Sequence, residues 1–239
     1  MHPLAAVVIR WLGQACFLLT TGGGAHLLID PPNPSVGYHI AAHSIPADLV
    51  FVSHNHPDHD YVEAVHGMAE EWGPILAHGF SETGARTERH HEKVSYHRLA
   101  AYHDNVHGAK RGPDTITVLE TGGLRVCHLG DLGQLALTPT QVKEIGKVDV
   151  LMIPVGGFFT IDGPQAAAIV GQLHPRVILP MHYRTAALNP DLRAKLSPPD
   201  AFLAAMRGKA AVVRVQARDL PLSPATLPKK PTIYLLRYH

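Results

Sequence analysis

The first half of the chain consists of short apolar runs separated by glycine, proline and polar turns, a pattern typical of β-strands. Two pairs of such runs predict β-hairpins, one from residues 7–20 and 25–30 around three glycines, and one from residues 115–120 and 124–129. The same criterion predicts further strands at 49–53, 75–77 and 94–102. Between them, residues 61–71 are expected to form a short helix, and the polar segment 79–93 a surface loop or a frayed helix.

In the second half, predicted helices alternate with apolar strands. Asp162-Gly163-Pro164 predicts a helix start, because a capping residue precedes a proline in the first helical turn. Helices are predicted at 138–147, 162–173 and 198–207, and strands at 148–155, 177–180, 212–215 and, as an edge strand, 233–236. Hairpins followed by alternating strands and helices predict mixed sheets covered by helices, in one α/β domain over residues 1–239.

The composition limits the classes of function. Hydrophobic residues make up 46% of the 239 residues and charged residues 17%, as in globular, soluble proteins. The formal net charge of +1 offers no basic field to hold nucleic acid or an anionic membrane. No apolar run reaches the roughly 18 residues of a membrane span, and the N-terminal run is interpreted as a strand rather than a signal peptide. Cys16 and Cys127 form no pair in sequence and are expected to be reduced, which predicts a cytoplasmic protein.

The candidate chemistry is concentrated in the segment His54-Asn55-His56-Pro57-Asp58-His59, which has four metal-ligand side chains within six residues. The segment follows the apolar run 49–52, and Pro57 prevents a regular strand or helix from continuing through it. We therefore expect a turn at the carboxyl end of a buried strand. Imidazoles and carboxylates suit Zn²⁺ first, with Mn²⁺ or Fe²⁺ as alternatives.

Three further candidate ligands stand at the ends of predicted strands, namely His103, Asp131 and His182. His97 and His107 remain alternatives to His103, because all three lie in one histidine-rich segment. A carboxylate such as Asp131 can bridge two cations that lie roughly 3.5–4 Å apart. The sequence thus predicts a site for two divalent metal ions.

At these positions the chain resembles the metallo-β-lactamase fold superfamily, and most of all the branch that includes the L-ascorbate-6-phosphate lactonases and many uncharacterised metal-dependent hydrolases. The supporting stretches are Trp11-Leu12-Gly13, Leu28-Ile29-Asp30-Pro31, His128-Leu129-Gly130-Asp131-Leu132-Gly133, Ile153-Pro154-Val155-Gly156-Gly157 and Pro180-Met181-His182-Tyr183. The resemblance spans residues 11–183. It implies a four-layer αββα sandwich with a dinuclear site at one edge of the two sheets.

The resemblance also implies roles for individual residues. It implies a first metal site of His54, His56 and His103 and a second of Asp58, His59 and His182, with Asp131 between the two. Two such cations lower the pKa of a shared water to give hydroxide near neutral pH, which Asp58 would aim at an ester, lactone or phosphodiester. Gln14 stands where this branch often has His, and it is expected near the pocket mouth with an open role in substrate contact.

Other side chains are candidates for supporting roles. Asp30 is a candidate for orienting a ligand histidine, with a turn-forming role as the alternative, and His128 is a second candidate of this kind. Arg111 and Tyr183 are candidates for contact with an anionic small-molecule substrate, the alternatives being a solvated surface residue and a packed ring. Residues 158–160 are candidates for a pocket wall or for core packing.

Two other functions remain open, a mononuclear iron dioxygenase of the same fold and a binding protein that retains metal without turnover. A nuclease of this fold generally carries an added domain and a basic groove, which this length and charge do not offer. Neither a Gly-x-Ser-x-Gly elbow nor a P-loop occurs, so a serine nucleophile and a nucleotide cradle have no support. The expected partner is a small molecule, without nucleic acid or membrane, and a homo-oligomer is left open.

Overall fold

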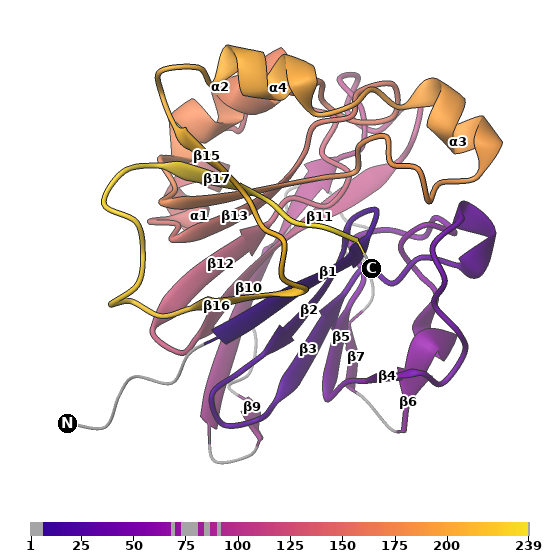
Figure 1. Cartoon of the computed structure of the whole chain (residues 1–239), viewed down its shortest axis with the longest axis vertical. Helices are drawn as coiled ribbons and strands as arrows, with labels where there is room; N and C mark the ends of the chain where they lie inside the picture. The colour runs from indigo at the N-terminus through magenta and orange to yellow at the C-terminus, as the bar shows by residue number, and fades with distance from the viewer. Residues whose placement is uncertain (1–6, 68–69, 73–80, 84–86, 90–91, 239) are drawn as a thin grey trace.

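Two β-sheets packed face to face form the centre of the molecule in the computed structural model, which describes residues 7–67, 70–72, 81–83, 87–89 and 92–238 (Figure 1). The first sheet has the order β16-β1-β2-β3-β5-β7, made by Asp219–Leu222, Val7–Gly13, Cys16–Thr20, His26–Ile29, Leu49–Phe51 and Glu70–Trp72. The second has the order β15-β17-β14-β13-β12-β11-β10-β8, with β9 also paired to β10. Its strands are Ala211–Arg214, Thr232–Leu235, Val177–Met181, Val150–Pro154, Leu124–His128, Pro113–Thr121, Glu92–Tyr102, Ser81–Thr83 and, for β9, Thr87–Arg89.

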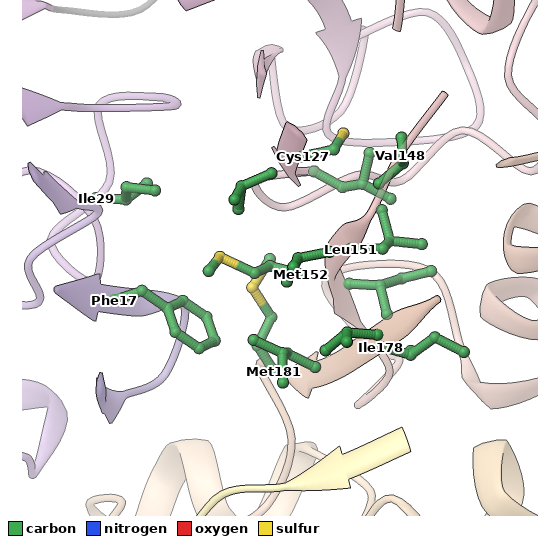
Figure 2. Close-up of a cluster of buried hydrophobic side chains, with 14 of the residues drawn as sticks. Phe17, Ile29, Cys127, Val148, Leu151, Met152, Ile178 and Met181 are labelled. Atoms are coloured by element: carbon green, nitrogen blue, oxygen red, sulfur yellow. The ribbon is translucent and has the colours of Figure 1, made fainter. Parts of the chain in front are cut away.

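The main core lies between the two sheets. Along β1 every second residue is buried, which is the period of a strand with one face against a core. In Figure 2, Phe17 and Ile29 of the first sheet point toward Met152 and Met181 of the second. The strands β13 and β14 are buried over their whole length, since helices cover their other face. The apolar runs that predicted these strands therefore reflect burial on both faces.

Helices cover the outer face of the second sheet (Figure 1). They are α1 (Pro139–Ile145), α2 (Gly163–Leu173) and α4 (Asp200–Ala205), while α3 (Pro190–Lys195) lies to one side. Capping boxes at Thr138 and Asp162 start α1 and α2, each with a proline in the first turn. The longest helix in the described part of the chain, α2, has 11 residues, so no helix described here has the length and apolar character to cross a membrane.

The outer face of the first sheet is covered differently. A second apolar cluster there joins Leu18, Leu28 and Val50 of the sheet to Ile45 and Val65. The covering segments are the 3₁₀ turn η2 (Val62–Ala64) and the short paired strands β4 (Ile45–Pro46) and β6 (Val65–His66), and a second 3₁₀ turn, η1, spans Pro34–Val36. The predicted α/β sandwich is thus confirmed.

The direction of the strands brings the candidate residues to one edge. Strands β12, β13 and β14 run parallel, and β10 runs in the same direction as β12 because both are antiparallel to β11. The carboxyl ends of β10, β12 and β14 therefore lie on one side of the second sheet. Three candidate positions follow these ends directly or within three residues, namely His103, Asp131 and His182.

Some predicted elements are wrong. The helix expected at 61–71 is replaced by η2 and β6, and residues 70–72 form β7 beside β5. Pairing with β4 and β5 outweighs the local preference, since a helix of this length has little stability of its own. The loop or frayed helix expected at 79–93 contains β8 and β9 in its described parts, because the long β10 offers them its free edge. The strand expected at 75–77 lies outside the described residues.

The N-terminal hairpin and the last strand also differ from the prediction, whereas the hairpin predicted at 115–120 and 124–129 is present as β11 and β12. Residues 7–20 form two strands rather than one, since the chain reverses at Gly13 and Gln14, both with positive φ. A side chain at position 13 would overlap the Tyr38 ring, so glycine is required there. The strand predicted at 233–236 exists as β17, but it pairs with both β14 and β15, so β15 is the edge strand instead.

Candidate metal centre

The turn after β5 and the end of β10 bring three imidazoles together. His54, His56 and His103 each place a ring nitrogen within 4.8 Å of the others. The centroids of the His54 and His103 rings lie 4.7 Å apart, and those of His56 and His103 lie 5.1 Å apart. His54 and His103 are buried, whereas His56 is partly open. These three side chains are the ones that the resemblance assigned to a first metal site, and the structure brings them together.

A second group lies beside the first and contains Asp58, His59, Asp131 and His182, again with ligand atoms within 4.8 Å of one another. Asp58 Oδ2 lies 3.4 Å from Nε2 of both His59 and His182. The side chain of Asp58 is 19% exposed, whereas that of Asp131 is 2% exposed. Of the two carboxylates, Asp58 is therefore the one that can be reached from solvent.

Asp131 lies between the two groups. Its Oδ2 atom is 3.4 Å from His103 Nε2 and 3.9 Å from His54 Nε2, on the side of the first group. The same oxygen is 3.3 Å from His59 Nε2 and 3.1 Å from His182 Nε2, on the side of the second. One carboxylate that faces four imidazoles from both groups has the geometry of a bridging ligand.

Several potential ligand atoms in these groups have no hydrogen-bond partner, as expected of atoms that bind a metal ion. Nε2 of His54, Nε2 of His59 and Oδ1 of Asp131 are buried without a hydrogen-bond partner among the described residues. Buried polar atoms normally have a partner, so this cluster of unpaired atoms calls for a ligand. Imidazole nitrogens and carboxylate oxygens are the donor set of divalent transition metals such as zinc.

Hydrogen bonds on the far side of two imidazoles set their orientation. His59 Nδ1 lies 2.9 Å from Asp30 Oδ2, and His54 Nδ1 lies 2.9 Å from Ser53 Oγ. Asp30 in turn accepts hydrogen bonds from the Ser53 backbone N–H and hydroxyl, both at 2.7 Å. These contacts turn the Nε2 atoms toward the cluster, as at metal sites with a carboxylate behind the histidine. The proposed orienting role of Asp30 is supported, and Ser53 was missed in the sequence.

Asp114 is a further buried carboxylate that the sequence did not reveal. Its Oδ1 accepts a hydrogen bond from the Asp131 backbone N–H at 3.1 Å and lies 3.8 Å from His54 Nδ1. Gly130, with φ of +55°, makes room for it, because a Cβ at that position would overlap the Asp114 carboxylate. Burial, and then the nearby charge of Asp131, raises the pKa of Asp114 well above its usual value.

Gln14 does not lie at the pocket mouth, and that expectation is wrong. The residue is fully buried, and its Nε2 donates a hydrogen bond of 2.9 Å to Asp58 Oδ2. Its backbone carbonyl accepts hydrogen bonds from the Trp11 indole N–H at 3.0 Å and from the His182 backbone N–H at 3.1 Å. The reversal between β1 and β2 places Gln14 against the second group from behind.

The two groups differ in their electrostatics. Burial lowers the pKa of His54 well below its usual value and that of His103 to about 4, so both imidazoles are neutral at pH 7 and free to donate a lone pair. Burial also opposes protonation of His59 and His182, but the carboxylates around them outweigh it. Asp131 contributes most, and the pKa of His182 rises to about 9.

The other candidate residues from the sequence do not belong to the ligand cluster. His97 contacts Glu144 and His107 packs on Tyr102, so neither joins the cluster. His128 holds the turn before Asp131, since its Nε2 lies 2.8 Å from the Ala15 carbonyl and its Nδ1 accepts from the Gly130 N–H. Tyr183 is buried in a stack with Trp11, as a packed ring.

Arg111 and the segment 158–160 meet at one cavity beside the cluster. Arg111 donates from Nη2 to the Phe158 carbonyl at 2.9 Å. Both residues line a cavity of about 270 Å³, together with Thr160 and Asp104. Residues 158–160 therefore form a wall of this cavity, and Phe159 also packs against a buried apolar cluster that contains Tyr38 and Leu188, so both alternatives apply to this segment.

The fold and this cluster define a metallo-β-lactamase-type protein, and the comparison with known families agrees. A model of the beta-lactamase superfamily domain matches residues 8–182, a range that contains every candidate ligand. The chain belongs to this superfamily and, within it, to the UPF0173 family of metal-dependent hydrolases.

Three relatives illustrate the similarity. A UPF0173 metal-dependent hydrolase of Anaeromyxobacter dehalogenans is 29% identical over 233 residues, which cover 85% of this chain and 82% of that protein. A UPF0173 protein of Pyrococcus furiosus is 33% identical over 186 residues, which cover 74% of this chain and 83% of that one. Among solved structures, a candidate Zn-dependent hydrolase of Thermotoga maritima shares 30% identity with a TM-score of 0.66 and covers 98% of this chain and 100% of that chain.

Proposed function

We propose that this protein is a hydrolase with a dinuclear metal centre that acts on an ester, lactone or phosphodiester. The observation that carries the proposal is the position of Asp131 Oδ2, within 3.9 Å of Nε2 atoms from both ligand groups. Two divalent ions held there would supply the lowered water pKa and the polarised electrophile that hydrolysis at neutral pH requires. Zn²⁺ fits the nitrogen-rich donor set, with Mn²⁺ or Fe²⁺ as alternatives.

The candidate ligands have different roles in the proposed reaction. His54, His56 and His103 would hold one ion, and Asp58, His59 and His182 the other, with Asp131 as the shared ligand. Asp58 is the carboxylate with access to solvent, so we assign it to accept a hydrogen bond from the attacking water and to aim that water. Asp131 is enclosed and serves to hold the two sites at a fixed distance.

The test combines metal analysis with a panel of lactone, phosphodiester, thioester and β-lactam substrates. The proposal expects two metal ions per chain in the wild type and hydrolysis of at least one substrate class. The variants Asp131→Ala and His56→Ala should each lose hydrolysis by about 10²-fold or more, with reduced metal content. The matched control His66→Ala removes an exposed histidine from β6 and should keep both properties.

The alternatives give different results in the same experiment. Full turnover in Asp131→Ala would contradict the assigned roles. One iron per chain together with oxygen uptake would favour a mononuclear dioxygenase. Two bound metal ions without hydrolysis across the whole panel would favour a protein that retains metal without turnover.

A further inference from the structure

A cavity of about 270 Å³ opens beside the candidate metal centre, between the loop that follows β10 and the loop that follows β13. Two of its lining residues, Asp104 and Gly133, lie within two positions of His103 and Asp131. A third, Phe159, has its ring centroid 6.4 Å from that of His182, with the two rings nearly perpendicular. The cavity is therefore built from neighbours of the metal ligands and reaches the ligand cluster through Phe159, although none of the seven candidate ligands lines it.

One wall of the cavity presents apolar side chains to solvent. Phe158 is 59% exposed and Leu135 is 49% exposed, and both line the cavity. Phe158 also has a φ of +58°, a conformation that is rare and strained for a bulky residue. Because the Phe158 ring is exposed, it adds nothing to core packing that could explain this backbone strain. Strained backbone conformations are concentrated at functional sites.

Positive charge surrounds the same wall. The Arg111 guanidinium carbon and the Lys195 ammonium each lie 5.7 Å from the centroid of the Phe159 ring. Arg111 and Lys110 line the cavity itself, whereas Lys195 lies outside its lining. No carboxylate in the described part of the chain lies within 4 Å of any of these three cations. Their charges are therefore available to a ligand.

The carboxylates that line the cavity are already engaged by backbone groups. Asp104 accepts four backbone N–H hydrogen bonds of 2.8 Å, two on each oxygen. Asp162 caps α2 and accepts the Gln165 N–H at 3.0 Å. Both carboxylates keep their negative charge, but the Asp104 oxygens are occupied by backbone donors, so among the charged lining groups Lys110 and Arg111 are the ones with donors for an anion.

We infer that this cavity selects substrates that carry an anionic group, a carboxylate or a phosphate, next to an apolar or aromatic group. Arg111 binds the anion, and its hydrogen bond to the Phe158 carbonyl sets the position of the guanidinium. Phe158 and Leu135 form the surface for the apolar part. This inference rests on the proposed function, since it names the class of substrate for the same site.

The experiment uses equilibrium binding to the metal-loaded full-length protein, measured by titration calorimetry, with three probes that cannot be hydrolysed as esters. The probes are 1-naphthylmethylphosphonate, 1-naphthaleneacetate and the uncharged 1-naphthaleneacetamide. The wild type should bind at least one anionic probe about tenfold more tightly than the amide. The anion with the larger Arg111-dependent preference distinguishes a phosphate from a carboxylate substrate.

Three variants separate the contributions. Arg111→Gln should weaken the preferred anionic probe about tenfold and leave the amide unchanged. Phe158→Gly removes the ring where glycine accepts the backbone conformation, and should weaken the anionic and neutral probes by the same factor. The control Arg207→Gln removes an exposed cation outside the cavity and should change neither.

The inference is overturned by any one of three results. These are no binding of any probe to the wild type, equal affinity for anionic and neutral probes, and equal effects of Arg111→Gln and Arg207→Gln. Binding needs no turnover, so Arg111-dependent binding without hydrolysis would contradict the proposed function alone. Hydrolysis without Arg111-dependent binding would contradict this inference alone.

Discussion

The carboxylate of Asp104 organises the loop that follows β10. Its two carboxylate oxygens accept backbone N–H groups from Val106, Gly108, Lys110 and Arg111, each at 2.8 Å. The carboxylate therefore folds the whole loop between His103 and Gly112 around itself. Asn at this position keeps the shape but turns one of the two acceptors into an NH₂ donor.

The size of the effect follows from the contacts. In Asp104→Asn, two backbone N–H groups face an NH₂ group instead of an oxygen. At about 1 to 1.5 kcal/mol for each lost hydrogen bond, the free energy of unfolding should fall by about 2 to 3 kcal/mol. In a chain of this size, this corresponds to a decrease in Tm of about 4 to 12 °C.

The pH dependence has a definite sign. Partial burial opposes ionisation of Asp104, but the backbone N–H donors, led by that of Arg111, outweigh it and lower the pKa to about 2. A lowered pKa stabilises the fold at pH values above the usual 3.8, and this contribution is lost as the pH falls through about 2. The difference between wild type and variant should be complete at pH 7 and should shrink below pH 3.8.

Equilibrium urea unfolding at several pH values measures this difference. The matched control is Asp162→Asn, since Asp162 accepts one backbone N–H and Asn caps helices as well as Asp does. The control should change the free energy of unfolding by less than about 0.5 kcal/mol. Equal midpoints for the two variants would refute the argument. A second measurement, metal affinity, should also decline in Asp104→Asn, because the loop positions His103.

Two further predictions concern the residues behind the cluster. Gln14→Leu removes the hydrogen bond to Asp58 Oδ2, so the metal affinity of the group that contains Asp58 should decrease about 10-fold or more in chelator competition. An unchanged metal affinity would exclude the positioning role. Gly130→Ala should lower the free energy of unfolding by about 1–2 kcal/mol for the left-handed backbone and by more for the displaced Asp114, as measured by urea unfolding. The control Gly208→Ala has a similar φ and open space around it, so a matching loss there would show that crowding against Asp114 has no part in the effect.

The sequence predicted the residues of the candidate site better than their surroundings. The turn after β5 follows from a buried strand that ends at a proline-containing motif, and both features are local. Asp114 and Ser53 gave no such signal, because an aspartate at a strand start and a serine before a histidine are common in any protein. Their importance comes from partners 17 and 23 positions away, Asp131 and Asp30.

The sequence by itself determined the strands whose apolar runs are buried, the capped helices α1 and α2, and the set of histidines and aspartates available for a metal. Burial periodicity, helix caps and residue chemistry are properties of neighbouring residues, and they can be interpreted without the fold. The tertiary structure alone decided that His103 rather than His97 or His107 joins the cluster, and that residues 61–67 form a 3₁₀ turn and a strand instead of a helix. It also decided that Gln14 lies buried against Asp58. These outcomes depend on strand pairing and side-chain packing between distant segments, whose energies exceed the local preferences of short stretches of chain.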